Sequence, residues 1–129
     1  MRGADGEVRF WDSPHNTHAK GILATSTLPA PLAVVEHAPA ARTLAGRIAE
    51  ALGYVGVLTC EFFATEAGPV FNEMAPRVHN SGHWTIEGAE TSQFENHVRA
   101  ICGLPLGDTR TVAPSVEMDN LIGREVDRK

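Results

Sequence analysis

The feature that most constrains the fold is a pair of β-rich apolar runs, residues 54–63 and 69–75, separated by turn residues. Glu66-Ala67-Gly68 lies between them. A three-residue hairpin loop needs a residue in the left-handed conformation, which glycine adopts without steric cost. The sequence therefore predicts an antiparallel hairpin in which residue 65 pairs with residue 69.

This register brings two acidic residues face to face. Phe63 lies opposite Phe71, and Glu61 lies opposite Glu73 on the same side of the hairpin. Directly opposed side chains have Cβ atoms about 4.5–5.5 Å apart, and like charges at that spacing destabilise a sheet. The pairing depends on the loop, because a two-residue loop would move Glu61 opposite Met74.

Such a pair requires compensation, because Glu61 sits in an apolar segment where an unpaired carboxylate is costly. A shared divalent cation is one solution, since hard oxygen ligands together with phosphate oxygens suit Mg²⁺. Protonation of one acid is a second solution, and an ion pair between each acid and a nearby arginine is a third.

The other periodic segments predict an α+β fold with an antiparallel sheet and packed helices. Leu44, Ile48 and Leu52 form one stripe of a helix, and Ser92 and Glu95 match a capping box at the start of another. Residues 12–20 read as a loop. The expected strands are 7–11, 21–28 and 111–122 besides the hairpin, and the expected helices are 40–52 and 93–102.

The run from Arg77 to His83 is rich in polar side chains and follows the second hairpin strand. Arg77 could hold a phosphate or carboxylate through two hydrogen bonds. His79 and His83 are spaced to share one helix face, but no third ligand lies at a recognisable spacing, which argues against a zinc site. The alternative is a loop capped by Asn80 and Ser81.

Charge and hydropathy exclude several classes of function. The net charge of -5 is unsuited to binding nucleic acid through its backbone. The sequence has no apolar run long enough to span a membrane. Cys60 and Cys102 sit in apolar segments, so we expect two buried thiols in a reducing cytoplasm.

The run FNEMAPRVHNSGHWTIEGAETSQFENHVRAICGLPLGDT resembles the 5-(carboxyamino)imidazole ribonucleotide synthase family of ATP-grasp ligases. DGEVRFWDSPHNTHAKGIL and GVLTCEFF are also similar to this family, so the resemblance extends from about residue 3 to residue 122. It implies the C-terminal lobe of an ATP-grasp domain. It also implies an enzyme of purine biosynthesis that uses ATP, Mg²⁺ and bicarbonate to carboxylate aminoimidazole ribonucleotide through carboxyphosphate.

The resemblance also implies residue roles. Glu61 and Glu73 match the positions that hold Mg²⁺, and His18 and Asn72 join Glu73 at the nucleotide. Strand alternation points Asn72 away from Glu73, so its role requires its backbone or a local bulge. The pocket for bicarbonate, carboxyphosphate and the ribonucleotide is matched by Arg77, His79, Asn80 and Ser81, with Arg77 and His79 in catalytic roles.

The resemblance covers only part of the family enzyme. We expect residues 1–122 to be the second ATP-grasp lobe and residues 123–129 a charged tail at the start of the C-terminal region. The N-terminal Rossmann-like domain and the first lobe have no counterpart, so we expect weak ATP binding and no turnover by this chain alone.

The resemblance further implies a cytoplasmic homodimer. Two alternatives stay open: a lobe of a different ATP-grasp ligase, and a non-catalytic metal-binding or dimerisation module. Histidines 15, 37 and 97 match no site position and are expected at the surface.

Overall fold

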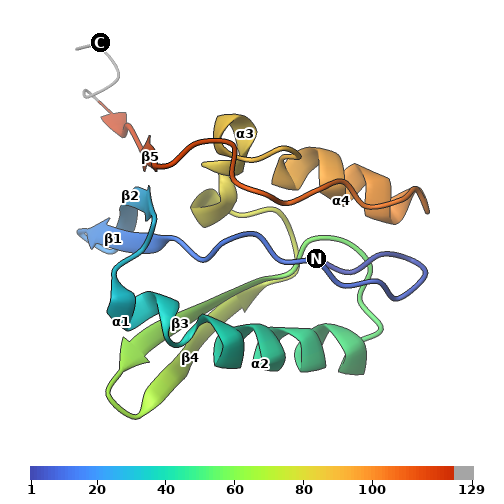
Figure 1. Cartoon of the computed structure of the whole chain (residues 1–129), viewed down its shortest axis with the longest axis horizontal. Coiled ribbons are helices and arrows are strands. Elements are labelled where there is room, and N and C mark those ends of the chain that lie inside the picture. The colour runs from blue at the N-terminus through green and yellow to red at the C-terminus, as the bar shows by residue number, and fades with distance from the viewer. Residues whose placement is uncertain (124–129) are drawn as a thin grey trace.

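The structure, a computed structural model, describes residues 1–123 (Figure 1). The predicted tail at 124–129 lies outside the described residues. The described elements, in chain order, are β1 (His15–Ala19), β2 (Ile22–Leu28), α1 (Leu32–Val35), α2 (Ala38–Ala51), β3 (Thr59–Thr65), β4 (Gly68–Ala75), a 3-10 turn η1 (Asn80–Gly82), α3 (Thr85–Gly88), α4 (Gln93–Ile101) and β5 (Val116–Asp119).

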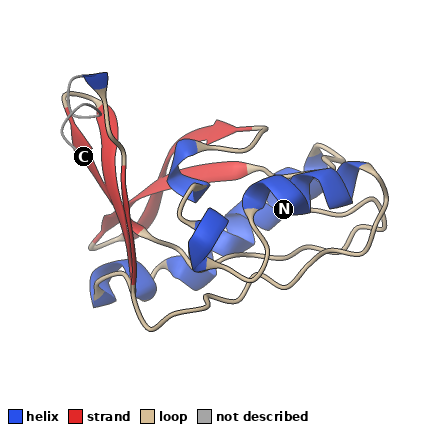
Figure 2. Ribbon diagram, turned by 90° about the horizontal axis from the view of Figure 1, so that it is seen from above, coloured by secondary structure: helices blue, strands red, loops and turns tan. Residues whose placement is uncertain are grey.

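The strands form two antiparallel sheets. One has the order β1-β2-β5, and the other is the β3-β4 hairpin. In Figure 1 the hairpin lies beside α1 and α2 at the bottom, and α3 and α4 lie at the top. Figure 2 shows the strands of the two sheets separated in space, with the helices beside them. This arrangement confirms the predicted α+β class.

Several local predictions are confirmed. The expected strand at 21–28 is β2, and the expected helix at 40–52 is α2, with Pro39 in its first turn. Gly53 follows that helix with φ +57, a conformation that glycine adopts readily at a helix end. Ser92 caps α4 by accepting a hydrogen bond from the backbone N–H of Glu95 at 3.2 Å.

Other boundaries are wrong. Residues 7–11 form only an isolated bridge, between Arg2 and Val8, whereas β1 forms in the segment expected to be a loop. Polar side chains hold β1 instead of apolar alternation: Ser26 donates to Asn16 Oδ1 at 2.6 Å, and the hydroxyls of Thr17 and Thr25 lie 2.6 Å apart. The expected strands at 54–63 and 111–122 shorten to β3 and β5.

Among residues 1–123, the core contains two small clusters. One contains Met1, Val57, Ala100 and Leu106, and the other contains Leu28, Trp84 and Ala89. Trp11 packs against both clusters, and its indole N–H donates to the carbonyl of Thr91 at 2.9 Å. This tryptophan therefore ties the segment before β1 to the segment before α4.

Helix α4 buries its polar face. Gln93 and Asn96 are 1% and 0% exposed, whereas the apolar residues Phe94, Val98 and Ile101 are exposed. Periodicity alone would place the apolar stripe toward the core. The buried side of α4 therefore combines Ala100 with two hydrogen-bonded amides, a pattern that hydrophobic spacing does not reveal.

His97 is not the surface residue that the sequence suggested. It is partly buried, and its Nδ1 accepts a hydrogen bond from the backbone N–H of Val57 at 3.0 Å. Within residues 1–123, the structure contains no helix long and apolar enough to cross a membrane.

Candidate functional site

The site begins with the β3-β4 hairpin, whose loop differs from the predicted one. The loop has two residues, because Thr65 pairs with Gly68. Gly68 has φ +116, which favours glycine. As a result, Phe62 rather than Phe63 lies opposite Phe71, and their rings meet edge to face at 5.9 Å.

A β-bulge then restores the predicted acidic pair. The register shifts between Glu61 and Phe62, so Asn72 is the extra residue on β4 and Glu61 pairs with Glu73. The prediction of an opposed pair is confirmed, although the loop length that led to it was wrong. The bulge also supplies the local irregularity that a role for Asn72 in the same site requires.

The two acidic side chains differ in exposure. The Glu61 side chain is 14% exposed, whereas that of Glu73 is 59% exposed. Burial makes Glu61 the costlier charge and leaves Glu73 in reach of solvent. The Glu61 carboxylate is therefore largely buried, and the Glu73 carboxylate is at the surface.

The imidazole of His79 lies between the two acids. Its Nδ1 is 3.7 Å from Glu61 Oε1, and its Nε2 is 3.9 Å from Glu73 Oε1. His79 thus occupies the place that one sequence interpretation gave to an arginine. One ligand atom from each of these three residues lies within 4.8 Å of the others. The two carboxylate oxygens are hard donors compatible with a divalent cation, and the imidazole lies beside them.

The segment after β4 holds the ring in place. His79 has an extended backbone at the start of η1, and its Nδ1 accepts from the backbone N–H of Ser81 at 3.3 Å. The Ser81 hydroxyl lies 2.9 Å from the same nitrogen. These contacts favour the tautomer that carries its proton on Nε2, the nitrogen that faces Glu73.

A cleft of about 590 Å³ adjoins the cluster. Four of the predicted site residues line it: His18, Glu61, Asn72 and Ser81. His18 and Asn72 are exposed on opposite elements, β1 and β4. The structure therefore brings both residues assigned to the nucleotide to one opening, next to the acidic pair.

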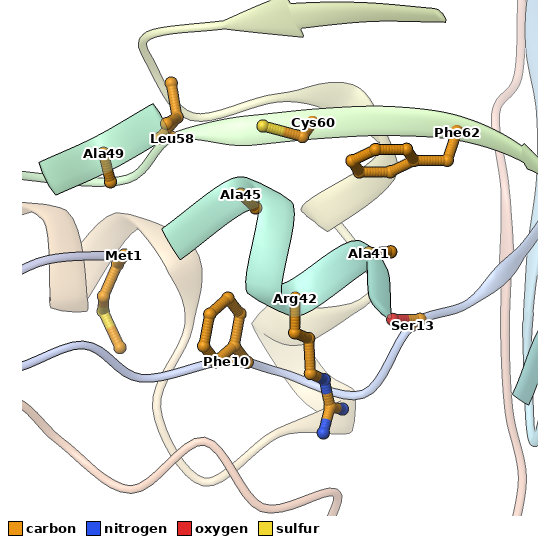
Figure 3. A pocket seen from close by; sticks show the side chains of 10 residues that line it. All are labelled: Met1, Phe10, Ser13, Ala41, Arg42, Ala45, Ala49, Leu58, Cys60 and Phe62. Carbon is orange, nitrogen blue, oxygen red and sulfur yellow. The ribbon is translucent and has the colours of Figure 1, made fainter. Parts of the chain in front are cut away.

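A smaller cavity of about 140 Å³ adjoins this cleft, between α2 and β3 (Figure 3). Figure 3 shows Cys60 and Phe62 on one side of it and Phe10 and Arg42 on the other. Burial raises the pKa of the Cys60 thiol. The positive charge of the Met1 terminal amine lowers this pKa by a smaller amount. Burial likewise lowers the pKa of that amine to about 6.

Three residues of the polar run lie outside the cluster. Arg77 is exposed, and its Nη1 donates to the carbonyl of Val78 at 3.0 Å. Asn80 is partly buried in η1. His83 does not share a helix face with His79; its ring stacks on Phe94 at 5.7 Å.

Sequence reasoning missed several residues near the site. Gln93, Thr85, His15 and Asn16 also line the cleft. Gln93 directly follows the predicted cap Ser92, which is the one sequence signal that could have drawn attention to it. His15 and His37 were expected at the surface; both are partly buried and line the cleft.

Comparison with known proteins places this geometry in context. Residues 1–94 match the ATP-grasp domain family. The chain is 54% identical to N5-carboxyaminoimidazole ribonucleotide synthase of Pseudomonas aeruginosa over 95% of its own length and 33% of that protein. It therefore spans about a third of the length of the curated relatives it matches.

Solved structures agree with this match. The N5-carboxyaminoimidazole ribonucleotide synthetase of Thermus thermophilus superposes with a TM-score of 0.89 at 56% identity, over 95% of this chain and 34% of that chain. The Aspergillus clavatus enzyme, in complex with ADP and 5-aminoimidazole ribonucleotide, superposes with a TM-score of 0.80 at 32% identity, over 88% and 31%.

Proposed function

This chain belongs to the ATP-grasp family, and on that basis we propose that residues 1–122 form the second lobe of an ATP- and Mg²⁺-dependent carbon–nitrogen ligase. The observation that carries the proposal is the opposed pair Glu61 and Glu73, next to a cleft lined by His18 and Asn72. Phosphoryl transfer depends mainly on positioning and charge neutralisation. A bound Mg²⁺ would neutralise phosphate charge at the two carboxylates.

The reaction that we propose for the complete ligase carboxylates aminoimidazole ribonucleotide. The γ-phosphoryl group of ATP passes to bicarbonate, which gives carboxyphosphate and ADP. The exocyclic amine of the ribonucleotide then takes the carboxyl group, phosphate leaves, and an N5-carbamate forms. This reaction is a step of purine biosynthesis. The names of the similar enzymes and the ligands of the Aspergillus clavatus structure support this choice.

The proposed roles of the individual residues follow from their places in the site. Glu61 and Glu73 hold Mg²⁺, and His18 and Asn72 contact the nucleotide. His79 and Ser81, at the inner end of the cluster, orient bicarbonate or carboxyphosphate, and His79 moves a proton at Nε2. Asn80 belongs to the same acceptor pocket. Arg77, which is exposed here, holds an anion of the acceptor pocket.

A chimera tests the proposal directly. Residues 1–122 replace the matching third of the Pseudomonas aeruginosa enzyme, and carboxylation of aminoimidazole ribonucleotide is measured with ATP, Mg²⁺ and bicarbonate. We expect turnover by the chimera and none by this chain alone, because positioning groups on other lobes supply much of the rate. A folded chimera that consumes ATP but transfers the activated acyl group to another acceptor would favour a different ATP-grasp ligase. A folded, inactive chimera would refute the proposal.

We also propose that the complete enzyme is a cytoplasmic homodimer. The apolar side chains that α4 leaves exposed, Phe94, Val98 and Ile101, favour burial against another surface. Sedimentation of the active chimera would decide its oligomeric state.

A further inference from the structure

The strongest unexplained feature of the interior is the polar face of α4. Gln93 and Asn96 are almost completely buried, although polar side chains are rarely placed there without a specific partner. Both amides bind backbone rather than other side chains. Asn96 accepts from Gly107 N–H at 2.7 Å and donates to its carbonyl at 3.3 Å.

Gln93 makes the same kind of clamp on the residue at the centre of the site. Its Oε1 accepts from the backbone N–H of His79 at 2.9 Å, and its Nε2 donates to the His79 carbonyl at 2.7 Å. These two bonds fix the peptide groups on both sides of the His79 Cα. They therefore restrict the direction in which the imidazole leaves the backbone.

A second layer holds Gln93 itself. Its backbone N–H donates to the hydroxyl of Thr85 at 2.9 Å, and that hydroxyl donates to the carbonyl of Gly82 at 2.6 Å. A Cβ at Gly82 would collide with the Gln93 amide, so glycine leaves the space that the amide occupies. The network joins the start of α4 to both ends of η1.

We propose that Gln93 is a positioning residue for the carboxylation reaction, holding the imidazole of His79 between Glu61 and Glu73 through the backbone of His79. The inference rests on the proposed function, because it assigns the purpose of a contact within that site. Gln93 acts without touching substrate. Groups that orient a ligand or catalytic side chain typically matter almost as much as the group itself.

Asn96 offers a matched control, because it is an equally buried amide on the same helix that clamps a segment outside the cluster. Gln93→Met and Asn96→Leu are compared in the isotope-labelled chain by NMR. We expect nuclear Overhauser contacts between the His79 ring and Ser81 to vanish in Gln93→Met and to persist in Asn96→Leu. Persistence in both variants, or loss in both, would overturn the proposal. If Gln93→Met does not fold, Gln93→Asn, which keeps the amide but is one methylene shorter, decides by the same contacts.

Binding of Mn²⁺ gives an independent measure that a purely structural role would not move. We expect about a tenfold weaker affinity in Gln93→Met, because a displaced His79 ring no longer orients the carboxylates of Glu61 and Glu73 that hold the ion. Asn96→Leu should keep wild-type affinity. Gln93→Met combined with His79→Ala should bind no more weakly than His79→Ala alone, since Gln93 acts through His79. Additive losses would contradict the proposal. If the wild-type chain binds no Mn²⁺, the NMR contacts alone decide the role of Gln93, and the chimera decides the metal role.

Discussion

The two halves of the site are held by different physical means. The β3-β4 hairpin presents Glu73 at the surface, and its apolar residues Phe63 and Phe71 are about half exposed. The segment from η1 to the start of α4 buries Ser81, Thr85 and Gln93. The hairpin aligns its acids by strand pairing and one bulge, whereas His79 is oriented by buried amide and hydroxyl groups. The hairpin thus exposes the carboxylate of Glu73 to solvent, while buried polar groups fix the imidazole of His79 beside it.

The sharpest test of this difference is Glu73→Ala. Removal of an exposed carboxylate should abolish carboxylation by the chimera and leave the fold of the chain intact, with a stability change within about 0.5 kcal/mol. Turnover and thermal unfolding measure the two effects. Glu66→Ala removes an exposed acid from the loop of the same hairpin and should keep full activity. Near-normal turnover by Glu73→Ala would remove its metal role.

The second test compares aromatic residues in the two halves. Trp84 is 4% exposed in the core cluster beside α3, so Trp84→Ala should cost about 3–5 kcal/mol in the free energy of unfolding. Phe63 is 58% exposed on the hairpin, so Phe63→Ala should cost about 1 kcal/mol. Urea unfolding provides both values. Equal costs would show that the hairpin is packed as tightly as the interior.

A third test compares two hydroxyl groups. Thr85→Val leaves the Gly82 carbonyl and the Gln93 N–H without their partner and should cost about 1–3 kcal/mol. Thr17→Val removes one side of an exposed hydroxyl pair on β1 and should change stability by no more than about 0.5 kcal/mol. Urea unfolding of both variants reports the difference, and a larger loss for Thr17→Val would reverse the comparison.

The smallest effect concerns the covered face of the hairpin. Cys60 faces the small cavity beside α2, and burial raises the pKa of its thiol. The thiolate is the reactive form, so at pH 8 Cys60 should react more slowly with a thiol reagent than the exposed Cys102. Because the folded state holds the thiol proton more tightly than the unfolded state, its stability also falls as the pH rises. The loss begins at the thiol pKa of the unfolded chain and is complete above the thiol pKa of the folded chain. Equal reaction rates would show that α2 does not cover this face.

Much of the fold followed from local sequence signals, because those signals act over a few residues. Pro39 and Gly53 bracket α2, and Ser92 caps α4, as expected. β1 escaped prediction because its strand depends on polar pairs with β2 rather than on alternation. The Glu61–Glu73 pair was found with the wrong loop length, since the bulge at Asn72 cannot be read from periodicity.

The sequence by itself determined that two β-rich runs would pair as a hairpin with an acidic residue on each strand, since turn residues act over a short stretch of chain. The bulge at Asn72, which the structure alone revealed, decided that these two acids lie opposite each other. Only the tertiary structure decided that His79 stands between them and that Gln93 holds its backbone. The reason is physical: a buried hydrogen bond between residues 14 positions apart depends on where two elements pack, and no local preference encodes that distance.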